Sequence, residues 1–145
     1  DRRLEFNVPF GRYKKPTICD EPNLRAAAAV LRGVDIARRP FDSVLDYAKE
    51  GDFVYFDPPY HPVSATANFT SYDRDGFAPD AQRRWRGVVA KLREHGVAAM
   101  VSNSDTPFIR ELYDGFRIDQ VQAARAVNSQ ANGRGKVAEL IIRNY

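Results

Sequence analysis

The stretch that decides the fold is Asp52-Phe53-Val54-Tyr55-Phe56-Asp57-Pro58-Pro59-Tyr60. Residues 53–56 are apolar and uncharged, and they lie between a Gly-Asp pair and two prolines, which is the pattern of a buried strand that ends abruptly. Each proline fixes its own φ and disfavours helical geometry in the residue before it. We therefore expect a strand at residues 53–56 that ends in a stiff, non-helical elbow at residues 57–60.

The elbow carries groups that are suited to holding a planar amine. The Asp57 carboxylate and a rigid backbone carbonyl of the elbow can each accept one N–H of an NH2 group. Those two bonds would draw the nitrogen out of conjugation with its ring and expose a lone pair. Tyr60 can stack on the ring that carries the amine, at about 1–3 kcal/mol per base. The alternative interpretation is a strand end followed by a proline turn, in which Tyr60 only caps a core.

The composition indicates a single globular domain with a sizeable core, because the chain has 145 residues of which 43% are hydrophobic and 12% aromatic. No apolar run approaches the roughly 18 residues that a membrane helix needs, so we expect no membrane span. Cys19 is the only cysteine, and no Cys/His cluster has the spacing of a zinc site. We therefore expect no disulfide, no metal site and a reducing, cytoplasmic setting.

The excess positive charge is concentrated at the N-terminus. Residues 1–15 hold five basic and two acidic side chains, interleaved with Phe6, Phe10 and Tyr13, whereas the remaining residues hold equal numbers of each sign. Basic and aromatic side chains on a short, loop-like segment are typical of contact with a polyanion. A solvated terminus without a partner is the alternative.

Helical and strand patterns alternate along the rest of the chain. Apolar spacing and the Pro and Gly positions predict helices that begin near Pro22, Phe41, Pro79 and Asp105, the last capped by Ser104 or Asp105. Strands are expected at residues 34–38, 53–56, 97–101, 116–122 and 137–143. Alternating strands and helices imply a mainly parallel sheet, and the last two strands, with no helix between them, predict an antiparallel hairpin at the sheet edge.

In such sheets ligands bind beyond the carboxyl ends of the strands. The elbow, Ser102-Asn103 and Pro40-Phe41 all follow predicted strands, so we expect them on the same side of the sheet. Ser102-Asn103 could equally cap a helix. Residues 61–78 form a connection long enough to indicate a functional loop or a disordered one.

Four segments of the chain resemble the Dam family of DNA adenine methyltransferases. They are Asp57-Pro58-Pro59-Tyr60 with residues 64–70, the basic and aromatic segment Phe6–Pro16, Ser102–Thr106, and residues 125–140, in the order in which the family carries them. The resemblance implies a partial Rossmann-like methyltransferase fold. Residues 1–20 would end the target-recognition segment, and residues 21–145 would form the C-terminal part of the catalytic domain.

The resemblance implies transfer of a methyl group from S-adenosylmethionine to adenine N6 in double-stranded DNA, within GATC, after the base leaves the stack. It implies catalytic roles for Asp57, Pro58, Pro59 and Tyr60, and cofactor binding by Asp57, Pro40 and Phe41. It implies DNA binding by Asn7, Pro9, Arg12, Tyr13, Lys14, Ser64 and Thr66. The alternatives are that Phe41 is an ordinary core residue and that Asn7 and Lys14 are ordinary surface residues.

Two parts of the family's pattern are missing: the Gly-rich cofactor motif and the first half of the recognition region. Both would precede Asp1, so we expect a C-terminal fragment, inactive by itself, that an N-terminal half completes in cis or in trans. A strand beside residues 53–56 would then be missing, which would leave an apolar sheet edge open. His61 stands where a smaller residue is expected.

Two other functions stay open. One is a catalytically inactive remnant that at most binds DNA. The other is methylation of RNA or of a protein amide, against which Asp57 and the basic N-terminal segment argue.

Overall fold

The computed structural model describes residues 17–63, 79–124 and 136–145, and the chain divides into two units, Asp1–Arg38 and Arg39–Tyr145. In the first unit, helix α1 (Glu21–Val30) begins after Asp20, whose side chain accepts a hydrogen bond from the backbone N–H of Asn23 at 3.3 Å. Pro22 lies in the first turn, where a missing N–H costs no helical hydrogen bond. The predicted start of this helix is therefore confirmed.

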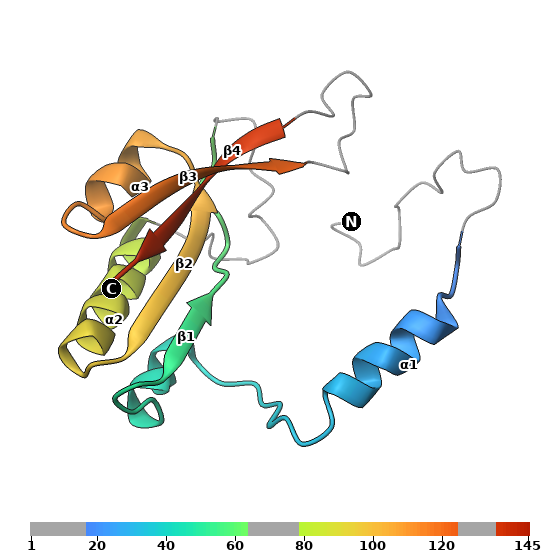
Figure 1. Cartoon of the computed structure of the whole chain (residues 1–145). Coiled ribbons are helices and arrows are strands. Elements are labelled where there is room, and N and C mark those ends of the chain that lie inside the picture. Colours follow the sequence, from blue (N-terminus) through green and yellow to red (C-terminus); the bar gives the residue numbers. More distant parts are fainter. Residues whose placement is uncertain (1–16, 64–78, 125–135) are drawn as a thin grey trace, which may run out of the picture. The chain divides into compact units, whose positions relative to one another are not determined.

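The second unit is built on a sheet with the strand order β1-β2-β4-β3 (Figure 1). Its strands are β1 (Phe53–Phe56), β2 (Ala98–Ser104), β3 (Arg117–Ala124) and β4 (Lys136–Arg143). β1 and β2 are parallel, whereas β4 pairs antiparallel with both β2 and β3. The predicted β3–β4 hairpin is thus confirmed, although β4 lies inside the sheet and β3 at its edge.

The expectation of a mainly parallel sheet is wrong for the described residues, because only the β1–β2 pairing is parallel. The hairpin supplies two of the three pairings, since its second strand inserts beside β2. The strand predicted at residues 34–38 is also wrong: these residues contain no strand. Residues 34–38 alternate apolar and polar side chains, but they pair with no strand among the described residues. A strand needs such a partner because its backbone N–H and C=O groups must form hydrogen bonds.

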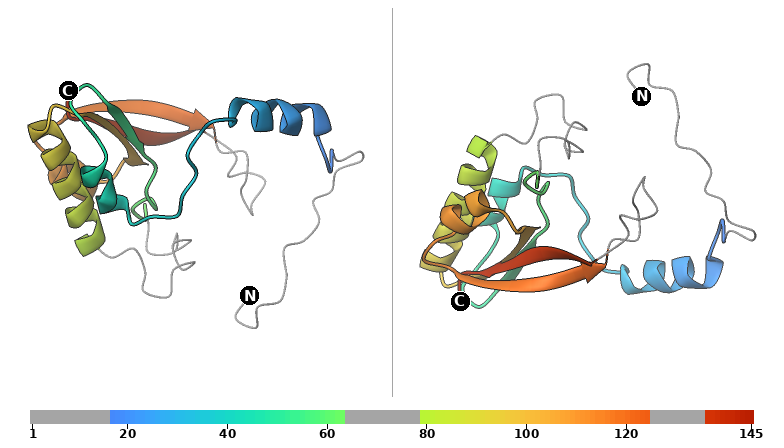
Figure 2. Two further views of the ribbon diagram at one scale, coloured as in Figure 1. Left: turned by 90° about the horizontal axis from the view of Figure 1, so that it is seen from below. Right: turned by 90° about the horizontal axis from the view of Figure 1, so that it is seen from above.

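Helices α2 (Pro79–Glu94) and α3 (Pro107–Leu112) lie on the same side of the sheet (Figure 2). The hydrophobic core forms between the sheet and these helices. Its side chains occupy alternate positions on the strands and positions at helical spacing on the helices. They are chiefly Trp85, Val88, Val89 and Leu92 of α2 and Ala99, Val101, Leu140 and Ile142 of the sheet. None of the helices in the described part of the chain is long and apolar enough to cross a membrane.

One helix cap and one helix type differ from the prediction. The cap of α3 is Thr106, whose hydroxyl accepts from the N–H of Ile109 at 3.3 Å, because β2 continues through Ser104 and delays the helix. The helix expected after Pro40 is a 3-10 helix, η1 (Phe41–Asp46). Gly96 follows α2 as expected, with a φ of 70° that favours glycine.

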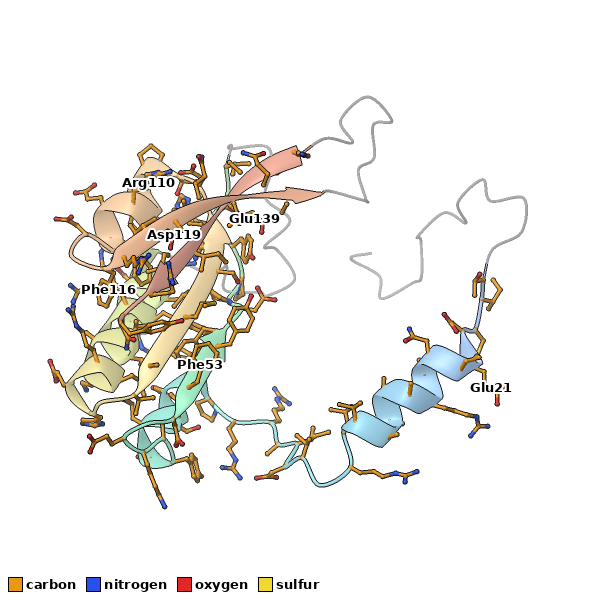
Figure 3. The ribbon with its side chains drawn as sticks, viewed as in Figure 1. Glu21, Phe53, Arg110, Phe116, Asp119 and Glu139 are labelled. Atoms are coloured by element: carbon orange, nitrogen blue, oxygen red, sulfur yellow. The ribbon has the colours of Figure 1, made fainter. Side chains whose placement is uncertain are left out.

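The other face of the sheet exposes aromatic side chains. Phe53 and Tyr55 alternate with the buried Phe56 on β1 and are 56% and 54% exposed, and Figure 3 shows Phe53 on this strand. β1 is also the last strand of the sheet among the described residues, because its only partner there is β2. An open apolar edge at residues 53–56 is what the sequence predicted.

Tyr113, at the end of α3, is fully buried, and no described residue forms a hydrogen bond with its hydroxyl. Burial raises the pKa of Tyr113 well above its ordinary value of 10.0. The unfolded chain therefore loses this proton at a lower pH than the folded chain does. Its contribution to stability is complete below about pH 10 and falls as the pH rises further.

Replacing Tyr113 with Phe should leave stability at neutral pH within about 1 kcal/mol of the original, because the hydroxyl has no hydrogen-bond partner to lose among the residues that the structure describes. Above about pH 10 the variant should resist alkaline unfolding better, by up to about 1.4 kcal/mol per pH unit. Urea unfolding across this range measures both effects. Tyr47→Phe is the control, since Tyr47 is exposed, and equal alkaline slopes for Tyr113→Phe and the unmodified chain would contradict the assignment.

Candidate active site

The parallel pairing of β1 with β2 places the elbow beside Ser102. Phe56 pairs with Val101, so the next residue on each strand, Asp57 and Ser102, meet at the carboxyl ends. The Ser102 hydroxyl donates to Asp57 Oδ1 at 2.9 Å and accepts from the Tyr55 hydroxyl at 3.1 Å. The Phe56 carbonyl is a more distant acceptor at 3.4 Å. The Asp57 side chain is therefore held through one oxygen while it remains exposed.

Tyr60 lies beside this carboxylate and is partly buried. Burial is the main cause that raises the pKa of Tyr60, and the charges of Glu139 and Asp57 raise it further, whereas the polar Ser102 hydroxyl nearby lowers it. The phenol therefore stays protonated at neutral pH. A neutral aromatic ring next to an exposed carboxylate can contact a flat heterocycle that carries an amine.

Two buried amide side chains hold the far end of the elbow. Gln82 of α2 donates from Nε2 to the Pro59 carbonyl at 3.0 Å. The backbone N–H of His61 donates to Asn103 Oδ1 at 2.9 Å. Asn103 lies within β2, so the alternative that Ser102-Asn103 caps a helix is wrong.

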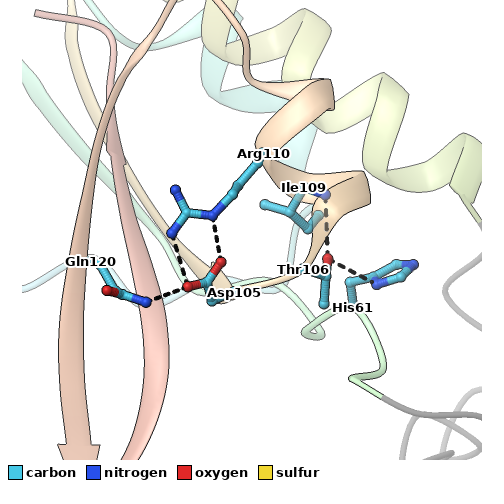
Figure 4. Close-up of polar contacts among 6 residues, drawn as sticks. All are labelled: His61, Asp105, Thr106, Ile109, Arg110 and Gln120. Atoms are coloured by element: carbon cyan, nitrogen blue, oxygen red, sulfur yellow. Dashed lines mark hydrogen bonds and ion pairs between the residues drawn. The ribbon is translucent and has the colours of Figure 1, made fainter.

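The side chain of His61 packs against the start of α3 (Figure 4). Its ring stacks on Phe108 with centroids 4.8 Å apart, and its Nδ1 lies 3.3 Å from the Thr106 hydroxyl. In the same view Asp105 binds Arg110 through two hydrogen bonds of 2.6 and 2.9 Å, and Arg110 holds the pKa of Asp105 below its usual range. The side chain that is larger than expected is thus accommodated by the start of α3.

Phe41 packs as a core residue: its ring stacks on Trp85 with centroids 4.2 Å apart. It also lines a groove of about 470 Å³ between η1 and α2, together with Asp42, Arg84 and Lys91. Asp57 is not among the residues that line this groove, and residues 34–38 form no strand, so the third strand expected before Pro40 is wrong. A contact of Pro40 and Phe41 with a cofactor stays a prediction.

The predicted DNA-binding residues lie outside the described residues. They are Asn7, Pro9, Arg12, Tyr13, Lys14, Ser64 and Thr66. The structure thus brings together the four predicted catalytic residues with Ser102, while their roles stay predictions. Across residues 17–63, 79–124 and 136–145, no three His, Cys, Asp or Glu side chains are grouped so that they could hold a metal ion.

Sequence reasoning missed two residues of the site, Tyr55 and Gln82. Tyr55 reads as one more apolar strand residue, and only the register with β2 brings its hydroxyl to Ser102. Gln82 had a local signal: it lies three residues before Trp85, on the apolar stripe of α2, and a polar residue in a buried stripe needs a partner.

Replacing Ser102 with Ala should raise the pKa of Tyr60 still further above its ordinary value of 10.0, because the one interaction that lowers it is lost. An NMR titration of the Tyr60 ring resonances measures this change. Ser104→Ala is the matched control, because Ser104 is a buried serine of the same strand. An unchanged or lower Tyr60 pKa in Ser102→Ala would rule out the proposed link between the two hydroxyls.

Comparison with known proteins identifies the family. The sequence profile of the D12 class N6 adenine-specific DNA methyltransferases matches residues 1–127. The chain is 41% identical over 143 residues to Type II methyltransferase M1.LlaDCHI of Lactococcus lactis subsp. cremoris, covering 97% of this chain and 50% of that protein. It is 37% identical over 139 residues to the DNA adenine methylase of Escherichia coli K12, covering 96% of this chain and 50% of that one.

A third relative is Type II methyltransferase M.MjaIII of Methanocaldococcus jannaschii, 42% identical over 147 residues that cover 100% of this chain and 51% of the relative. The chain thus spans about half the length of the curated relatives it matches. The matched profile covers most of the chain, including the elbow at residues 57–60 and the Ser102 that holds it. The chain belongs to the D12 class of N6 adenine-specific DNA methyltransferases.

Proposed function

We propose that this chain is the C-terminal part of an S-adenosylmethionine-dependent methyltransferase that modifies adenine N6 in double-stranded DNA, within GATC. The observation that carries the proposal is the exposed Asp57 carboxylate, held by Ser102 at the end of β1 next to the proline elbow and Tyr60. The family membership and the relatives named DNA adenine methylase support the same chemistry.

The elbow would act by hydrogen bonding to the adenine amine. Asp57 Oδ1 already accepts from Ser102, which leaves Oδ2 available for one amine N–H. Among the described residues the Pro58 carbonyl has no hydrogen-bond donor, so it can accept the other. With both protons held, the nitrogen lone pair turns away from the ring and becomes nucleophilic. Most of the rate enhancement would come from holding this nitrogen in line with the methyl group.

Tyr60 would stack on the adenine after the base leaves the duplex. Extrusion costs a few kcal/mol, which stacking and the two hydrogen bonds offset. The raised pKa of Tyr60 means that its ring stays neutral at neutral pH. The ring is also partly buried beside the Asp57 carboxylate.

S-adenosylmethionine would supply a methyl group on a positively charged sulfur. The described residues fit this cofactor in part. The exposed Asp57 carboxylate can face the positive charge, and Phe41 lines a groove whose volume of about 470 Å³ lies within the range of small-molecule pockets. We propose that Phe41 and Pro40 flank the adenine of the cofactor, with Trp85 on one face of the Phe41 ring and the cofactor at its edge or its other face.

DNA would be bound by the basic N-terminal segment and by the segment after the elbow. Asn7 and Lys14 would contact DNA phosphates, and Arg12 would lie in the DNA interface. Pro9 and Tyr13 would face the target bases, and Ser64 and Thr66 would close on the duplex. The charge distribution supports this, because the whole net charge of +3 comes from residues 1–15.

This chain aligns with about half of each relative. We propose that a complete enzyme also needs the other half. We propose that it packs on the open side of β1, whose edge is unpaired among the described residues and whose Phe53 and Tyr55 are exposed. A second candidate is a remnant that binds DNA without methylating it. Cofactor-dependent methylation distinguishes the two.

Methylation should appear when this chain is combined with the N-terminal half of M1.LlaDCHI, supplied as a separate polypeptide. Asp57→Ala in the combined enzyme should abolish methyl transfer from radiolabelled S-adenosylmethionine to a GATC duplex and leave duplex binding largely intact. Asp114→Ala is the control, because Asp114 is exposed and remote from the elbow in the sequence. No methylation by the unmodified pair, with retained DNA binding, would support the remnant, and loss of binding together with activity in Asp57→Ala would contradict its role.

Replacing Arg12 with Ala should weaken DNA binding and make it less dependent on salt. Each phosphate contact contributes about 0.9 to the slope of log K against log salt concentration, so the slope should fall by about that amount. Fluorescence anisotropy with a labelled duplex at several salt concentrations measures it. Arg93→Ala, which removes an exposed arginine of α2, should leave the slope unchanged, and an unchanged slope in Arg12→Ala would remove Arg12 from the interface.

A further inference from the structure

We propose that the buried amide side chains of Gln82 and Asn103 are positioning residues that hold the proline elbow in its reactive geometry. Gln82 is 1% exposed and Asn103 is 0% exposed, and they come from different elements, α2 and β2. Their effect on catalysis rests on the proposed function. Their effect on the mobility of the elbow can be measured independently of that function.

The two amides form one chain of hydrogen bonds that ends on the elbow at both sides. Gln82 Nε2 donates to the Pro59 carbonyl at 3.0 Å, and Gln82 Oε1 accepts from Asn103 Nδ2 at 3.2 Å. Asn103 Oδ1 accepts from the backbone N–H of His61 at 2.9 Å and from that of Ser104 at 2.9 Å. The peptide segment from Pro59 to His61 is therefore tied to a helix and to a strand at once.

The elbow needs such ties because its sequence removes the usual ones. Pro58 and Pro59 have no N–H, so neither can donate to a neighbouring strand. The groups that remain for anchoring are the carbonyls and the N–H groups of Tyr60 and His61. Gln82 and Asn103 engage the Pro59 carbonyl and the His61 N–H, and they leave the Pro58 carbonyl and Asp57 Oδ2 for a ligand.

A role limited to core packing does not account for these amides. Gln82 lies on the same stripe of α2 as Trp85 and Leu92, where an apolar residue would bury without a desolvation cost. An amide there becomes favourable only because its partners are the elbow and Asn103. Displacing a reacting group by about 1 Å can cost on the order of a hundredfold in rate, so an anchor of this kind would act on catalysis more than on folding.

The chain offers a matched control in Asn144, a third buried amide with three hydrogen bonds. Asn144 accepts from the N–H of Ala99 at 2.7 Å and donates to the carbonyls of Val89 and Val97 at 3.2 and 3.0 Å. Ala99 lies at the start of β2 and Val97 just before it, at the opposite end from Asn103, and Val89 lies in α2. Asn144→Leu should therefore cost stability without acting on the elbow.

The first experiment uses amide hydrogen exchange on the 145-residue chain, followed by NMR, with the variants Gln82→Met, Asn103→Leu and Asn144→Leu. The exchange rate of the His61 amide is divided by that of Val101 in β2, which corrects for a change in overall stability. Asn103→Leu removes the acceptor of the His61 N–H, so the ratio should rise about tenfold, and Gln82→Met should raise it by a smaller factor. Asn144→Leu should leave the ratio unchanged.

The second experiment measures methylation by the chain combined with an N-terminal half. Gln82→Met and Asn103→Leu should lower kcat on the order of ten- to a hundredfold while the KM for S-adenosylmethionine changes less than twofold or so. Asn144→Leu should keep kcat. Equal ratios of exchange in all three variants, or equal losses of kcat, would overturn the positioning role. No methylation by the unmodified combination would overturn the proposed function, whereas the exchange ratio would still decide whether these amides hold the elbow.

Discussion

The hydrogen bond between the Ser102 hydroxyl and the Asp57 carboxylate joins the two parallel strands at the edge where the site lies. It exists only in the register that pairs Phe56 with Val101. A shift of one residue would move every side chain of β1 to the other face of the sheet and carry Asp57 away from Ser102. The buried faces of β1 and β2 prevent that shift, so the hydrophobic core determines the geometry of the candidate active site.

The carboxyl end of β2 and the cap of α3 that follows it hold buried polar side chains, which are Ser102, Asn103, Ser104 and Thr106. Buried polar groups cost free energy unless they are hydrogen bonded. Here Ser102 and Asn103 bind the elbow, and Thr106 caps α3 and contacts His61. The strand thus changes along its length from a core element into a set of anchors for the residues that would hold the substrate.

Strongly local patterns in the sequence were predicted well. Asp52 and the prolines after Asp57 bound the strand at residues 53–56, and a regular apolar stripe marks the helix that begins at Pro79. Both elements could therefore be predicted without knowing what they pack against. The strand expected at residues 34–38 failed because alternation over so few residues does not specify a strand without a partner. The share of parallel pairings in the sheet was overestimated because β4 pairs antiparallel with both β2 and β3. The β2–β4 pairing depends on how the hairpin docks on the sheet, which the local sequence does not show.

By itself the sequence determined that Asp57 follows an apolar strand, that two prolines stiffen the turn after it, and that the segments resemble a DNA adenine methyltransferase, whereas the burial expected for that strand holds on one face only. These features are local, and a reader of the chain needs only the order of residues to find them. The tertiary structure decided which side chains hold the elbow. Gln82, Asn103 and Ser102 reach it across 23, 42 and 45 residues of chain, through a strand register and a helix packing that no local pattern encodes.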